Sequence, residues 1–144
     1  ASENDIKSFS MTGQRRDLNR EKFKSENLLA VLNNPESNAN KNLKYLRNAM
    51  DVRSELKQFH PCSQMKCLSK GRSDIVVIKR GKGPESVFAI HNMTENKINY
   101  QLNDNDLPKI IDNDFNTHDF LTSTKYNCKN ISLDPFQVIW LSAL

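Results

Sequence analysis

The chain has 144 residues and a formal net charge of +4, and 37% of its residues are hydrophobic. This length suits one ordinary domain or parts of two, and the low apolar content implies a modest core. Basic and acidic side chains are interleaved, which argues against a nucleic-acid-binding protein. No apolar run approaches the roughly 20 residues that span a bilayer, and there is no signal-peptide pattern. We therefore expect no nucleic-acid partner, no membrane partner and a cytoplasmic location.

Three cysteines, Cys62, Cys67 and Cys128, are too few and too oddly spaced for a disulfide framework or a usual zinc site. Free thiols in a reducing compartment are the simplest interpretation. His60 and His91 also lack the spacing of metal ligands. We expect neither a cofactor nor a bound metal.

Residues 1–24 are polar and are expected to be irregular. They contain the most distinctive stretch of the chain, because four charged and two amide side chains lie within residues 14–20. Arginine forks beside Asp and Asn favour bidentate recognition of a small hydroxylated or anionic ligand. A solvated or salt-bridged surface loop would have the same composition.

Two helices follow. Ser25 is expected to cap a short helix that Asn33-Asn34-Pro35 stops. Ser37 or Asn40 then opens a longer helix to about Gln58, before Pro61. Its apolar spacing indicates one buried face and one solvated face. That buried face would carry Leu43, Leu46, Met50 and Leu56.

The character of the sequence changes near residues 60–66. Residues 74–80 and 86–92 read as two strands of a hairpin around a Gly-Lys-Gly-Pro turn. Further strands are expected at 97–102, 130–133 and 136–141, whereas 109–128 is ambiguous. The aromatic residues of this half are expected in the core, and His118 with its neighbouring aspartates in a polar loop. These aromatic residues are Tyr100, Tyr126, Phe136 and Trp140. Helices first and antiparallel strands afterwards favour an α+β class or two separate units.

Five landmarks stand in one order along the chain: Glu-Asn-Asp-Ile at 3–6, Gly-x-x-Arg-Asp-Leu-Asn-Arg at 13–20, a helix ending in Phe-His-Pro at 52–61, Val-Phe-Ala-Ile-His-Asn at 87–92, and Pro-Phe-Gln-Val-Ile-Trp-Leu at 135–141. Together they resemble the C-terminal portion of sucrose phosphorylases and their relatives in the α-amylase superfamily. The family fold is a (β/α)8 barrel followed by a small antiparallel β domain. The resemblance implies that residues 1–61 are the last active-site loop and closing helices of the barrel, and that 62–144 are the β domain.

The resemblance also implies retaining α-glucosyl transfer from sucrose or a related α-glucoside to phosphate, giving α-glucose 1-phosphate. The catalytic carboxylates would lie upstream, so the chain alone should be an inactive fragment that needs its missing barrel. In this sequence Arg16 would contact the bound glucosyl unit, with Arg15 as a rival, and Asp17 would orient a guanidinium. The alternatives are a non-catalytic carbohydrate-binding or interaction β module and a complete small protein of unrelated function.

Overall fold

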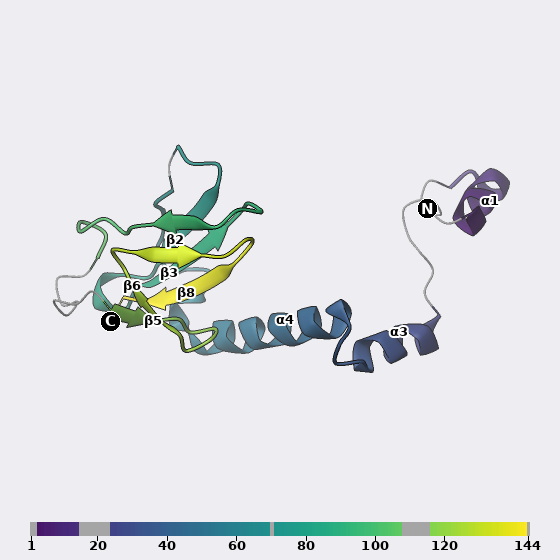
Figure 1. Cartoon of the computed structure of the whole chain (residues 1–144), viewed down its shortest axis with the longest axis horizontal. Coiled ribbons are helices and arrows are strands. Elements are labelled where there is room, and N and C mark those ends of the chain that lie inside the picture. Colours follow the sequence, from purple (N-terminus) through teal and green to yellow (C-terminus); the bar gives the residue numbers. More distant parts are fainter. Residues whose placement is uncertain (1–2, 15–23, 70, 108–115, 144) are drawn as a thin grey trace. The chain divides into compact units, whose positions relative to one another are not determined.

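A computed structural model describes residues 3–14, 24–69, 71–107 and 116–143 (Figure 1). Helices come first and antiparallel strands afterwards, so the expected mixture of helix and sheet is confirmed. Close contacts divide the chain into two units, residues 1–46 and residues 47–144. Within the described ranges, no helix is both long and apolar enough to cross a membrane.

The N-terminal segment contains a helix, α1 (Glu3–Thr12), where we expected irregular structure. Glu3 and Asp5 lie in its first turn, where carboxylates interact favourably with the helix dipole. Gly13 ends it in the left-handed region, with φ of +67°, and its N–H donates to the carbonyl of Phe9 at 2.7 Å. This is the αL termination that glycine adopts readily. The expectation of irregular structure is therefore wrong for residues 3–12.

Helix α3 (Ser25–Asn33) has the expected extent, but Ser25 is its first residue rather than its cap. Helix α4 (Asn38–Glu55) begins after Ser37, whose Oγ accepts the backbone N–H of Asn40 at 3.1 Å. Ser37 is therefore the N-cap, one of the two expected candidates. The helix ends at Glu55, earlier than expected, and a short 3-10 helix, η1 (Lys57–Phe59), follows.

The apolar faces of these helices are largely uncovered. Neither α3 nor α4 buries a side chain. On the face of α4 that the sequence marks as apolar, Leu46 is 58% and Met50 is 70% exposed, and Leu43 is half-buried. The expected burial of this face is not seen.

The second unit is built on a four-stranded antiparallel sheet of order β1-β2-β3-β8. The β2–β3 hairpin is confirmed, and a short 3-10 helix, η2 (Gly83–Glu85), lies in its turn. Strand β1 was not predicted, and β8 begins two residues later than expected. The strands are β1 (Met65–Cys67), β2 (Ile75–Arg80), β3 (Val87–Asn92) and β8 (Val138–Ser142).

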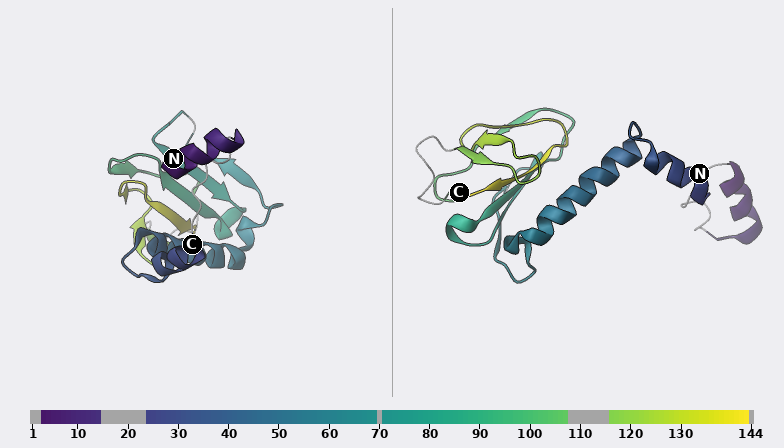
Figure 2. Two further views of the ribbon diagram at one scale, coloured as in Figure 1. Left: turned by 90° about the vertical axis from the view of Figure 1, so that its right-hand side faces the viewer. Right: turned by 90° about the horizontal axis from the view of Figure 1, so that it is seen from below.

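Two small sheets complete this unit (Figure 2). Strand β4 (Ile98–Tyr100) pairs with β7 (Ile131–Leu133), and both fall within segments predicted as strands. Strand β5 (Asn116–His118) pairs with β6 (Lys125–Asn127) in the region that the sequence left ambiguous. His118 therefore lies in a strand rather than in a polar loop.

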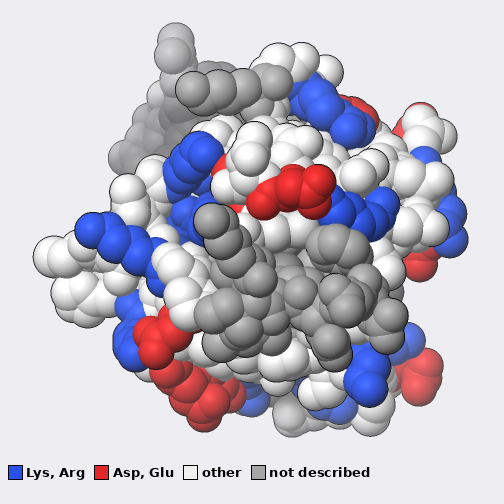
Figure 3. Space-filling view, turned by 90° about the vertical axis from the view of Figure 1, so that its left-hand side faces the viewer, with Lys and Arg blue, Asp and Glu red and all other residues white. Residues whose placement is uncertain are grey.

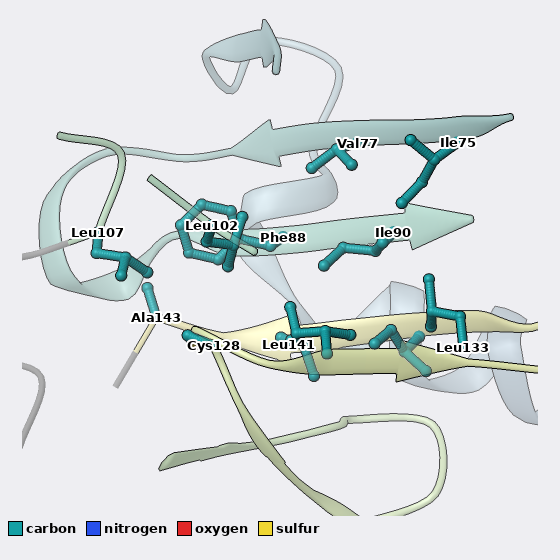
Figure 4. Packing of buried hydrophobic residues seen from close by; sticks show 12 residues of the cluster. Ile75, Val77, Phe88, Ile90, Leu102, Leu107, Cys128, Leu133, Leu141 and Ala143 are labelled. Atoms are coloured by element: carbon teal, nitrogen blue, oxygen red, sulfur yellow. The ribbon is translucent and has the colours of Figure 1, made fainter. Parts of the chain in front are cut away.

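One core cluster lies between the inner face of the large sheet and the segments that pack on it (Figure 4). The sheet contributes Ile75, Val77, Phe88, Ile90, Ile139 and Leu141, and the other segments contribute Leu102, Leu107, Cys128, Ile131, Leu133 and Ala143. Tyr100 and Tyr126 pack against this cluster as expected. Phe136 is 65% exposed, and Trp140 lies outside the cluster, so both were wrongly assigned to the core. Strand alternation places Ile139 and Leu141 inward and therefore Trp140 outward.

Candidate functional site

The predicted ligand-binding residues Arg15, Arg16 and Asp17 lie outside the described residues. Their segment joins α1, which ends at Thr12, to α3, which begins at Ser25. Their role stays a prediction. The described residues offer a second candidate, which the sequence did not single out as a site.

This candidate is a groove of about 430 Å³ on the outer face of the large sheet. The strands fix its floor, because residues that alternate with the core positions point away from the core. Ala89 is the centre of this floor, paired with Ile78 on one side and with Trp140 on the other. The rest of the lining is Arg53, Phe59, Pro61, Met65, Arg80 and His91.

The wall of the groove is held against the sheet by one stacking contact and two hydrogen bonds. The rings of Phe59 and Trp140 have centroids 4.6 Å apart and planes inclined by 42°. Arg80 donates from Nε to the carbonyl of Gln58 at 3.1 Å and from Nη2 to the carbonyl of His60 at 2.8 Å. Because these bonds use neutral acceptors, they fix the segment after α4 without neutralising the guanidinium.

Three sequence landmarks converge in this groove. Phe59 and Pro61 come from the Phe-His-Pro helix ending, His91 from β3, and Trp140 from β8. Sequence reasoning treated these landmarks as separate. The signal that could have joined them is strand alternation, which puts His91 and Trp140 on the same face of the sheet.

The groove is apolar and positively charged. Arg53, Arg80 and His91 line it, and no carboxylate of the described ranges does. Burial lowers the pKa of His91 below its ordinary value, because the charged imidazolium loses hydration there. The described lining can bind a ligand, but it does not contain the pair of carboxyl groups that glycoside cleavage uses.

The one fully buried carboxylate among the described residues has a structural role. Asp119 is 0% exposed. Its Oδ1 accepts the backbone N–H groups of Trp140 at 2.7 Å and Leu121 at 3.2 Å, and its Oδ2 accepts the hydroxyl of Thr122 at 2.7 Å. Both oxygens are thus occupied in closing a turn against β8. Asp119 also forms an isolated bridge to Leu141. It is therefore a buried residue with protein donors, and the expectation of a solvated polar loop is wrong at this position.

The aromatic residues do not form a flat sugar-stacking platform. The guanidinium carbon of Arg72 lies over the ring of Tyr100, 5.6 Å from the ring centroid. The hydroxyl of Tyr126 accepts a hydrogen bond from Nε2 of Gln137 at 2.9 Å. Both rings also pack on the core, and the rings of the groove are inclined to each other.

Basic and acidic side chains are intermixed on the described part of the face in Figure 3.

No protein-family model matches the chain, and no curated protein matches its sequence. Solved structures resemble its fold. One is AmyP in complex with maltose, with a TM-score of 0.60 and 16% identity over 74% of this chain and 21% of AmyP. Another is trehalose-6-phosphate hydrolase of Bacillus licheniformis, with a TM-score of 0.54 and 18% identity over 79% of this chain and 20% of the hydrolase.

Both neighbours are glycoside hydrolases of the α-amylase family. The chain spans about a fifth of the length of each. At this level of identity the likeness concerns the fold alone. The chain has a fold that occurs as part of α-amylase-family glycoside hydrolases.

Proposed function

We propose that the chain is the C-terminal portion of a sucrose phosphorylase-like α-glucosyl transferase. The observation that carries the proposal is the structural likeness to two α-amylase-family enzymes over about three quarters of this chain. The landmark order at residues 3–6, 13–20, 52–61, 87–92 and 135–141 supports the narrower specificity for sucrose or a related α-glucoside with phosphate.

In this proposal, residues 1–61 belong to the end of the catalytic barrel and residues 62–144 form the C-terminal β domain. The stacking of Phe59 on Trp140 and the bonds from Arg80 to the segment at 58–60 would then join the two parts. The role of these residues would be to set the end of the barrel on the β domain. No reacting group would come from this region.

The chemistry would follow the retaining scheme. An upstream carboxylate attacks the anomeric carbon and displaces the leaving sugar, whose oxygen takes a proton from a second carboxyl group. A phosphate oxygen then attacks the anomeric carbon, releases the first carboxylate and gives its proton to the second. Arg16 would donate to a hydroxyl of the glucosyl unit, with Arg15 as its rival and Asp17 as the residue that orients the guanidinium.

The first test is the coding sequence upstream of Ala1. The proposal requires about 250 residues or more there, with Asp and Glu at the ends of predicted strands. The 144-residue chain alone should form no α-glucose 1-phosphate from sucrose and phosphate. An active isolated chain, or an upstream sequence without those carboxylates, would overturn the proposal.

The second test uses the longer enzyme. Arg16→Ala should lower kcat/KM for sucrose phosphorolysis by about tenfold to a hundredfold, which corresponds to the loss of one charge-assisted hydrogen bond. Arg47→Ala changes an exposed arginine of α4 and is the matched control, with kcat/KM unchanged. A loss with Arg15→Ala alone would move the role to Arg15, and no loss with either variant would remove both from the subsite.

A further inference from the structure

A second hollow adjoins the groove. It has a volume of about 380 Å³ and lies along the end of α4 and η1. Arg53, Phe59 and Pro61 line both hollows, so these side chains form the ridge between them. The second hollow is otherwise lined by Met50, Ser54, Leu56, Lys57 and His60. We call the two hollows with their ridge the ridge surface.

The charged side chains that line the ridge surface are basic. Among the residues that the structure describes, no Asp or Glu lines either hollow. Lys57 is paired with Glu85 at 2.7 Å. In the described part of the chain, Arg53 and Arg80 form no ion pair with a carboxylate, so their charges are available to an anionic partner.

The ridge surface is also rigid at its centre and adaptable at its borders. The stack of Phe59 on Trp140 and the hydrogen bonds of Arg80 hold the ridge in place before anything binds. At the borders, Met50 is 70% and Met65 is 63% exposed. Methionine side chains at such positions can adapt to the shape of a partner.

We propose that the ridge surface is a docking site for an acidic polypeptide segment. The segment places apolar side chains in the two hollows and its carboxylates against Arg53 and Arg80. A polypeptide fits better than a compact small molecule, because two hollows on either side of one ridge can be filled together only by an elongated ligand with two apolar groups. This inference goes beyond the proposed enzyme function and does not depend on it.

Trp140 provides a direct readout, since it is the only tryptophan of the chain and lines the groove. The probe is a synthetic peptide in which two leucines, one helical turn apart, are flanked by glutamates. We expect a saturable change in Trp140 fluorescence that weakens as salt is added. A matched peptide with lysine in place of each glutamate should bind at least about tenfold more weakly, because it meets like charges.

Two variants localise the binding. Arg53→Gln removes a cation shared by both hollows and should weaken binding of the glutamate peptide by about three- to tenfold. Arg47→Gln, on the same helix but outside both hollows, should leave binding unchanged. Met50→Glu puts a carboxylate at the border of one hollow without disturbing the core, and should reduce binding further.

Several outcomes would overturn the proposal. The two peptides could bind equally, Trp140 could fail to respond to saturating peptide, or Arg47→Gln could weaken binding as much as Arg53→Gln. Inorganic phosphate that reproduces the full response would show a simple anion site instead. Sedimentation that shows self-association, with Trp140 already shielded, would assign the surface to a second copy of the chain.

Discussion

The helical unit, residues 1–46, and the β unit, residues 47–144, use their apolar side chains in opposite ways. Every buried hydrophobic residue in the described chain lies between Ile75 and Ala143, whereas α1 and α3 carry exposed Ile6, Met11, Leu28 and Leu29. The periodicity of a helix shows which face could be buried. Burial itself requires a second surface. The strands of the β unit provide that surface for one another, and α1 and α3 do not.

The largest effect should come from a cavity in the β unit. Ile90→Ala removes a side chain that is 0% exposed and should lower the free energy of unfolding by about 3–4 kcal/mol. Leu46→Ala, at a side chain that is 58% exposed, should change it by less than about 0.5 kcal/mol. Urea unfolding followed by Trp140 fluorescence measures both. Equal losses would show that the face of α4 is covered in solution and would break the comparison between the units.

The next effect concerns the buried carboxylate. Asp119→Ala leaves two backbone N–H groups and a hydroxyl without their acceptor. The free energy of unfolding should therefore fall by about 2–4 kcal/mol. Asp134→Ala removes an exposed carboxylate that pairs with Lys97 at 3.2 Å, and should cost at most about 1 kcal/mol. Thermal melting in the same buffer compares the two. Similar melting temperatures would contradict the structural role of Asp119.

A smaller effect separates two glycines with the same backbone. Gly71 and Gly81 both have φ of +83°, so alanine at either position is strained by about 1–2 kcal/mol. A Cβ at Gly81 would also lie 2.9 Å from Cγ of Gln58, whereas one at Gly71 meets nothing within 4 Å. Gly81→Ala should therefore be the more destabilising in urea titrations. Equal losses for the two variants would show that Gln58 moves away at no cost, and a larger loss at Gly71 would contradict the predicted order.

The smallest effect is a pH dependence of the β unit. The pKa of His91 is lowered by burial, so between the ordinary value of 6.5 and the lowered value the unfolded chain binds a proton that the folded chain does not. Stability from this residue is present above pH 6.5 and falls as the pH drops below it. His91→Gln should flatten this part of the stability curve, and an unchanged slope would contradict the assignment.

Sequence reasoning succeeded where a local pattern and its partner coincide. The β-branched run at 74–80 and the apolar run at 86–92 predict a hairpin because each strand is the other's partner and a glycine turn joins them. Helices α3 and α4 were found from spacing and from their flanking polar residues. Six residues of the groove lie within three of the sequence landmarks, whereas Met65, Ile78 and Arg80 belong to none of them.

The failures have two causes. Strand β1 is a Met-Lys-Cys segment with little intrinsic preference for a strand, and it forms because the edge of β2 offers hydrogen-bonding partners. Trp140 was assigned to the core because it lies in an apolar terminal strand, although the alternation of its neighbours Ile139 and Leu141 decides its side of the sheet. Long-range pairing and three-dimensional convergence are not encoded in any single window of sequence.

The place of β8 in the chain has a consequence for biosynthesis. Ile139 and Leu141 are fully buried, and β8 pairs with β3, which the ribosome makes long before it. Until β8 has left the exit tunnel, one edge of β3 has no hydrogen-bonding partner, and the core lacks the side chains of Ile139 and Leu141. The nascent β unit therefore passes through a period with an open sheet edge, when chaperones and neighbouring nascent chains can reach it. A slowly translated stretch before β8 would lengthen that period, and rapid translation would shorten it.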